Sequence, residues 1–207
     1  MLTTASLVIV LAGFSPSFFL RDGSQVPLAP SFLWHGIILT SWYLLAVIQS
    51  LLIGVGFSAR RLRAHKTMGV ASLVIAIAVL VSGIQVALDF YDHGESTQIL
   101  SKQGLLTANL MNLASFAICF TAGMVMRKRR DLHKRFLALA GIVMIGPAAF
   151  RLVVIAGLPP PASLIIQFGL LALLAIYDRR RLHRISKATW SGFLLIILMI
   201  GVTLAVG

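Results

Sequence analysis

Long apolar stretches alternate with short polar ones along the whole chain, and seven of the apolar stretches stand out by their length. A helix needs about 20 mainly apolar residues to cross a bilayer. Backbone groups in lipid must find hydrogen-bond partners within their own segment, so such stretches form helices. The pattern predicts an all-α integral membrane protein, a seven-transmembrane-helix bundle in a single domain over residues 1–207. The expected helices cover approximately residues 2–20, 31–57, 68–90, 104–126, 136–157, 160–177 and 188–206.

Positive charge is concentrated in alternate connections between these stretches. The chain holds 18 Lys and Arg against 6 Asp and Glu, and most of the cations lie in three short runs. Cytoplasmic loops carry such an excess. This places the basic connections and the amino terminus in the cytoplasm, and the carboxyl terminus in the periplasm, of a bacterial inner membrane. The arginines expected to bind anionic lipid headgroups are Arg60, Arg61, Arg63, Arg127, Arg129, Arg130, Arg179 and Arg180.

Composition supports the same class of protein. Hydrophobic residues make up 58% of the chain and charged residues 12%, against about 45–50% and about 25% in soluble domains. A net charge of +12 would suggest nucleic acid as a partner in a soluble protein. The placement of the cations between apolar stretches, and the lack of any nucleic-acid-binding motif, exclude that partner. The bilayer and its anionic lipids are the expected partners.

The first stretch and the basic runs also indicate how the chain is organised. Residues 1–20 could be a cleaved signal sequence, but no basic region precedes the apolar core, which favours a retained first helix. Segments 63–66, 130–134 and 181–184 each place a histidine next to Lys or Arg between two apolar stretches. The chain is therefore expected to be one leading helix followed by three helical hairpins.

Polar side chains on five predicted helices lie at similar depth in the outer half of the membrane. Arg151 is the most informative of them, because an ionisable group inside a spanning helix is costly and usually functional. It follows the pair Gly146–Pro147, which is expected to kink its helix. Two interpretations are open: a ligand pocket in which Arg151 pairs with Asp89 or with an anionic ligand beside His35, or hydrogen bonds that only hold helices together. The candidate residues are His35, Gln85, Asp89, Asn112, Arg151 and Gln167.

Three histidines, His65, His133 and His183, share a register just inside the cytoplasmic ends of three helices. A shared register is what a metal or haem site would need. Each of them adjoins Lys or Arg, however, which disfavours a bound cation. Contact with lipid headgroups is the expected role, with a metal ion or haem b as alternatives. Cys119 has no second cysteine to pair with and is expected to be a buried spacer.

Short motifs are spread over nearly the whole chain: GFSPSFFL at 13–20, HG at 35–36 with Trp42 and Gln49, HKTMG at 65–69, HKRF at 133–136 and RL at 151–152. Together they resemble those of a group of uncharacterised bacterial multi-pass membrane proteins of the domain-of-unknown-function type. The resemblance implies a helical bundle and brings no established activity. The positions it implies to be important are His35, Trp42, Gln49, His65, Gly69, His133 and Arg151.

Motifs of common enzymes are absent from the sequence, including the nucleotide-binding glycine loop, HExxH, GxSxG and paired acidic metal ligands. No catalytic residue is assigned, and the chain is expected to be non-enzymatic. The expected function is binding of a lipophilic or prosthetic group, such as a quinone, haem or pigment, in the outer-leaflet pocket. An accessory subunit of a larger membrane complex is the alternative. A small transporter is a third interpretation, disfavoured because the sequence shows no pair of broken helices.

Overall fold

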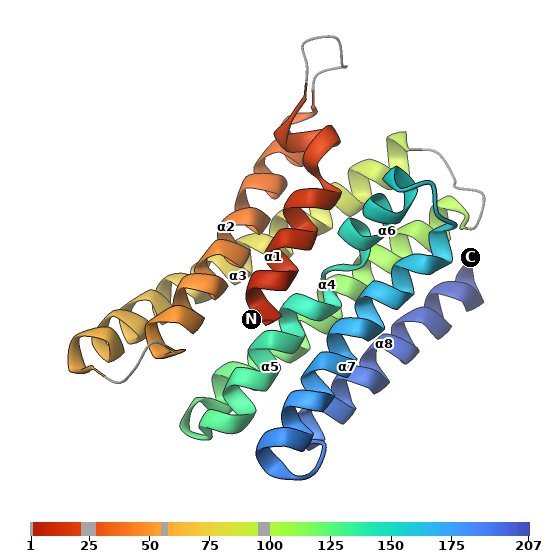
Figure 1. The fold of residues 1–207 in the computed structure, drawn as a ribbon. Helices are drawn as coiled ribbons and strands as arrows, with labels where there is room; N and C mark the ends of the chain where they lie inside the picture. The colour runs from red at the N-terminus through yellow and green to blue at the C-terminus, as the bar shows by residue number, and fades with distance from the viewer. Residues whose placement is uncertain (1, 22–27, 55–57, 95–99) are drawn as a thin grey trace.

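Helices make up all the regular structure that the computed structural model describes, which covers residues 2–21, 28–54, 58–94 and 100–207 (Figure 1). Short helical turns, η1 (Ser15–Phe19), η2 (Met126–Lys128) and η3 (Pro160–Ala162), join or extend the longer helices. The α-helices are α1 (Leu2–Gly13), α2 (Pro30–Gly54), α3 (Ala59–His93), α4 (Lys102–Val125), α5 (Arg130–Val143), α6 (Gly146–Ile155), α7 (Ser163–Leu182) and α8 (Lys187–Val206).

Within the described ranges, five helical segments are long and apolar enough to cross a membrane, and the bent pair α5–α6 would make a sixth. This set is compatible with a multi-pass membrane protein. The prediction of seven spanning helices is not confirmed, because α1 has only 12 residues before the chain enters the π-helical turn η1. Pro16 has no N–H to donate to the preceding turn, and the Phe19 N–H reaches back five residues to the Phe14 carbonyl.

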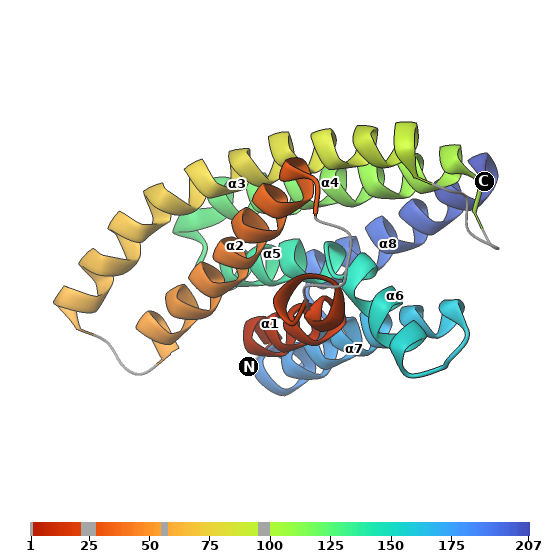
Figure 2. The same cartoon turned by 90° about the horizontal axis from the view of Figure 1, so that it is seen from above.

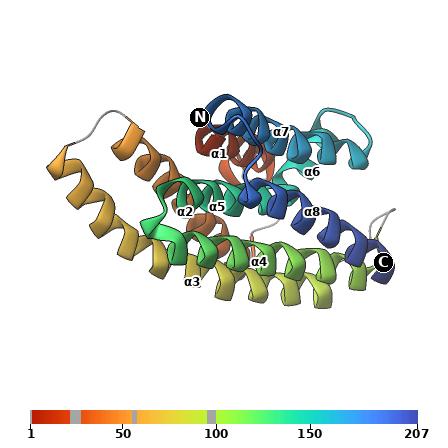
Figure 3. The same ribbon diagram turned by 90° about the horizontal axis from the view of Figure 1, so that it is seen from below.

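The helices are arranged in layers around α5. Seen from above and from below, α3 and α4 lie on one side, α1 and α7 on the other, and α2, α5 and α8 between them (Figures 2 and 3). Leu139, Ala140 and Ile142 of α5 are completely buried, as is Cys119 of α4, which confirms the expected spacer role of the thiol. Many large apolar side chains are exposed, as expected of a surface that faces lipid; among them are Val70, Ile165 and Leu194.

One predicted helix proves to be two. The stretch 136–157 was expected to be a single span, whereas α5 ends at Val143, α6 begins at Gly146, and the two axes differ by 46°. Pro147 explains the break, because it has no N–H for the Val143 carbonyl and its ring crowds the preceding turn. The kink expected at Gly146–Pro147 is therefore confirmed.

The basic runs lie largely within helices, which corrects their assignment to loops. Arg60, Arg61 and Arg63 belong to the first turns of α3, and Arg179 and Arg180 to the last turn of α7. Arg and Lys are good helix formers, and their long side chains allow a helix to continue beyond its apolar part. We call the end of the bundle formed by the start of α3, the turn η2 and the connection between α7 and α8 the basic end.

Candidate functional site

Two histidines that are far apart in the sequence meet at the basic end. His65 lies in the second turn of α3 and His133 in the first turn of α5, with ring centroids 6.3 Å apart and planes at 88°. His133 Nδ1 lies 2.7 Å from the Gly123 carbonyl oxygen of α4. A carbonyl only accepts, so Nδ1 carries the proton, and the Nε2 of a neutral His133 ring has a free lone pair.

Gln49 of α2 joins this pair. Its Nε2 donates to the backbone carbonyl of His65 at 3.2 Å. Gln49 Oε1 and His65 Nδ1 are buried, and neither has a hydrogen-bond partner in the part of the chain that the structure describes. A buried polar atom without a partner costs about 1–3 kcal/mol. We call Gln49, His65 and His133 the Gln–His site; its three side chains offer an amide oxygen and two imidazoles.

The third histidine of the predicted register lies apart from these contacts. His183 is exposed and caps the carboxyl end of α7 in the left-handed conformation, with φ of 55°. Two of the three histidines therefore meet, as a shared metal or haem site would require. Among the described residues, no group of three or more His, Cys, Asp or Glu side chains could hold a metal ion. Any metal here would depend on the two imidazoles with Gln49 or an external ligand.

Beside His133, a buried ion pair connects α5 to α7. Arg135 Nε lies 2.5 Å from Asp178 Oδ1, and the two side chains are 1% and 0% exposed. The other carboxylate oxygen of Asp178 accepts from the Ser186 N–H at 3.0 Å and from the Thr189 hydroxyl at 2.5 Å. Asp178 therefore also stabilises the amino-terminal end of α8, where a negative charge is favourable.

Lys134 lies between His133 and Arg135 in the sequence, and each of these three side chains has its own partner. Its ammonium lies 2.9 Å from Asp131 and donates to the Tyr177 hydroxyl at 3.2 Å. The positive charge next to His133 in the sequence is thus paired with a carboxylate and directed toward α7. Because the charge of Lys134 is paired in this way, it disfavours a metal ion at His133 less than the sequence alone suggests.

The six residues of the predicted outer pocket lie in several separate environments. His35 Nδ1 contacts the Ser82 hydroxyl at 3.0 Å, and Gln85 is exposed. The Arg151 guanidinium stacks on the ring of Phe14, 4.4 Å from its centroid. Within the described ranges no ion pair joins Arg151 to Asp89, whose backbone oxygen contacts the ring of the exposed His93. In the part of the chain that the structure describes, no hydrogen bond or ion pair connects Arg151 or Asp89 to His35.

The other two pocket candidates, Asn112 and Gln167, both lie at the break between α5 and α6. Gln167 Nε2 donates to the carbonyls of Ile142 and Val143, at 3.1 and 3.3 Å. The Tyr43 hydroxyl donates to the preceding carbonyl, that of Gly141, at 2.9 Å. Side chains from α2 and α7 therefore take up the backbone acceptors at the end of α5, as buried backbone polar groups require.

Asn112 faces the start of α6. A Cβ added to Gly146 would lie 3.7 Å from Asn112 Oδ1 and 3.9 Å from its Nδ2. The side chain is only 9% exposed, and its Oδ1 has no hydrogen-bond partner among the described residues. The amide thus packs against the backbone of the break without bonding to it.

Arg135, Asp178 and Tyr43 were not singled out from the sequence. Asp178 is an acidic residue between an apolar stretch and three arginines, and that position was the available signal. Tyr43 stands beside Trp42 in an apolar run and gives no sign of its hydrogen bond. The partners of all three lie many residues away, which local pattern does not reveal.

Comparison of the chain with protein-family models, with curated proteins and with solved structures returns no match. Its function therefore has to be inferred from the geometry of its own side chains.

Proposed function

We propose that this chain is a membrane protein that holds a transition-metal centre at the Gln–His site, either a bare ion or the iron of a haem. The observation that carries the proposal is the meeting of His65 and His133, with ring centroids 6.3 Å apart and His133 oriented by the Gly123 carbonyl. A ligating histidine almost always donates its other ring N–H to a carboxylate, a carbonyl or water. The prosthetic-group function expected from the sequence is kept, and its site moves to the basic end.

The unpaired atoms of the site favour a cationic ligand. Gln49 Oε1 can only accept, and a neutral His133 ring presents the lone pair of Nε2. The buried Nδ1 of His65 adds a third atom for which no partner lies among the described residues. Imidazole suits zinc, copper, iron and nickel ions, and it is also an axial ligand of haem iron. A metal ion bound by the two imidazoles would have further coordination positions, which Gln49, a porphyrin or an exchangeable ligand could occupy.

Metal content and the visible spectrum of detergent-purified protein test this proposal. We expect wild-type protein to carry metal, with a Soret band if the metal is haem iron and without one if it is a bare ion. His65→Ala and His133→Ala should lose the metal while keeping the elution profile of the folded protein. His183→Ala and His93→Ala remove exposed histidines elsewhere and are the matched controls.

Two results would contradict the metal centre. Wild-type protein that is free of metal and colourless, even after incubation with zinc, copper or haemin, would end the proposal. Equal metal loss in the His183→Ala control would show unspecific binding to surface histidines. Colourless protein that co-purifies with another membrane complex would instead support the accessory-subunit interpretation.

We also propose the detailed membrane topology that the sequence predicts. It has seven spans in a bacterial inner membrane, with α1 and η1 as the first and α5–α6 as a broken fifth. The positive-inside rule supports a cytoplasmic basic end. Reporter fusions after Lys128 and after Gly157 should report the cytoplasm and the periplasm, and the reverse pattern would contradict this topology.

A further inference from the structure

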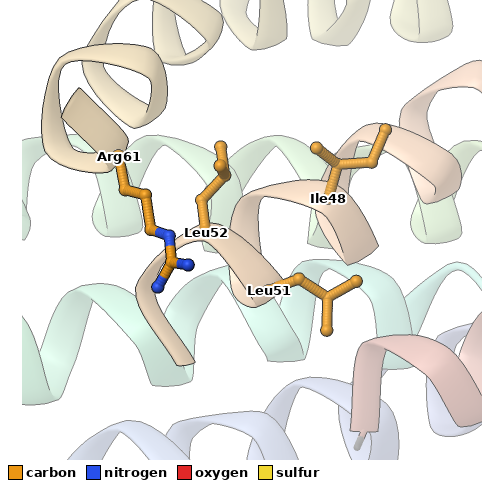
Figure 4. Close-up of a pocket in the computed structure, with 4 residues that line it drawn as sticks. All are labelled: Ile48, Leu51, Leu52 and Arg61. Atoms are coloured by element: carbon orange, nitrogen blue, oxygen red, sulfur yellow. The ribbon is translucent and has the colours of Figure 1, made fainter. Parts of the chain in front are cut away.

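The last turns of α2 and the first turn of α3 enclose an open groove at the basic end. Ile48, Leu51 and Leu52 of α2 and Arg61 of α3 line it, with a volume of about 220 Å³ (Figure 4). Figure 4 shows the Arg61 side chain extending toward the end of α2, next to Leu52. At about 30 Å³ for a water-sized group, the groove has room for about seven such groups. Its walls are apolar apart from one cationic group, so it matches a molecule with an apolar chain and an anionic head.

Charge at the start of α3 indicates the same kind of occupant. Arg60, Arg61 and Arg63 lie in or next to its first turn, which contains no acidic residue. Cations are unfavourable at a helix amino terminus, where the helix dipole is positive. Within the described ranges, the side chain of the N-cap residue Ser58 makes no capping hydrogen bond. An anion at this end of α3 would interact favourably with the cluster of arginines and with the helix dipole.

We infer that this groove is a binding site for one anionic phospholipid of the bilayer, with an acyl chain against Ile48, Leu51 and Leu52 and the phosphate at Arg61. A soluble anion would leave the apolar walls uncovered, and a zwitterionic lipid would bring no net negative charge to this cluster of arginines. Ile48 and Leu51 are 43% and 55% exposed, so a lipid acyl chain can enter the groove from the side that faces the bilayer. The inference rests on the membrane placement and not on the metal centre.

Native mass spectrometry of delipidated protein, titrated with phosphatidylglycerol or phosphatidylcholine, tests the site. Wild-type protein should retain one phosphatidylglycerol in preference to phosphatidylcholine. Arg61→Gln should lower the affinity for phosphatidylglycerol about tenfold or more, the effect of losing a hydrogen bond to a charged phosphate. Leu51→Trp should also lower the affinity for phosphatidylglycerol, because the larger side chain fills the groove without changing the charge. If Leu51→Trp does not fold, Leu51→Ala is used in its place and should lower the affinity by removing apolar contact.

Arg63→Gln is the matched control, because it removes the same charge two residues along the helix, on roughly the opposite side. Its affinity for phosphatidylglycerol should fall by no more than about fivefold, the effect of removing one cation near an anionic lipid surface. Equal losses for Arg61→Gln and Arg63→Gln would overturn the inference in favour of diffuse attraction. Equal retention of both lipids, or unchanged affinity in both Leu51 variants, would overturn it as well.

Discussion

Arg135 and Asp178 form an ion pair inside the bundle, although the sequence places both among exposed arginines. Their side chains are 1% and 0% exposed, and Nε and Oδ1 lie 2.5 Å apart. Both charges lose their hydration, and the further hydrogen bonds that the two groups make offset part of that cost. Ser186 and Thr189 satisfy Asp178, and the Asp131 carbonyl accepts from Arg135 Nη1 at 2.6 Å, whereas the buried Arg135 Nη2 has no partner among the described residues. Through these bonds, one carboxylate connects α5, α7 and α8.

Asp178→Asn should therefore destabilise the protein strongly. It leaves Arg135 buried without a counter-charge, for which we expect a loss of about 3–5 kcal/mol in the free energy of unfolding. Thermal unfolding in detergent, followed by circular dichroism, measures the change. Asp131→Asn is the control, because the Asp131 side chain is 65% exposed and a surface ion pair contributes about 0–1 kcal/mol.

An apolar replacement of the whole pair separates charge from packing. Arg135→Met combined with Asp178→Leu removes both buried charges, so the double variant should be more stable than Asp178→Asn alone. If Asp178→Asn unfolds at the wild-type temperature, the pair does not contribute to stability as described.

The second prediction concerns Gln167 and the broken helix. Gln167→Leu removes the donor to the carbonyls of Ile142 and Val143 and leaves them buried. We expect a loss of about 1–3 kcal/mol for the unpaired acceptors, together with faster hydrogen exchange at the end of α5. Gln85→Leu makes the same change at an exposed position of α3 and should have little effect. A Gln167→Leu protein with unchanged stability and exchange would show that the break needs no donor from α7.

Apolar length and proline position account for the parts of the fold that the sequence predicts. Long apolar runs predict helices because lipid leaves the backbone no other partners. Pro147 predicts a kink because it lacks a donor. The break in the first span was missed, since whether a proline such as Pro16 bends a helix or ends it depends on what packs around it. Gly13 packs against the Ala148 carbonyl of α6, too closely for a Cβ, and that contact lies outside the range of local pattern.

The burial of charged side chains is the property that a hydropathy pattern predicts least well. Arg135 is one of six cations between 127 and 135, and Asp178 precedes three arginines, so both fell just outside the predicted helices. Their burial depends on helices that continue past their apolar parts and on a pairing across 43 residues. The histidine register was visible, but only the structure separates His183 from the pair of His65 and His133.

The last prediction distinguishes the two interpretations of Arg151. Its guanidinium lies 4.4 Å from the ring centroid of Phe14, and such a contact contributes about 0.5–2 kcal/mol. Arg151→Met and Phe14→Leu should therefore be non-additive by about that amount in a double-mutant cycle on unfolding free energy. Phe18→Leu, in the adjacent turn η1, provides the control cycle and should be additive with Arg151→Met to within about 0.5 kcal/mol.

The same Arg151→Met protein also tests the predicted outer pocket. If Arg151 serves only to attach η1 to α6, the variant loses stability and retains whatever molecule co-purifies with the wild-type protein. If Arg151 binds an anionic ligand beside His35, the Arg151→Met protein loses the bound molecule. The effects of Phe14→Leu and Phe18→Leu on the unfolding free energy are then both additive with that of Arg151→Met. Additive effects together with an unchanged bound molecule would contradict both interpretations, because a cation at this depth is costly unless a contact or a ligand compensates it.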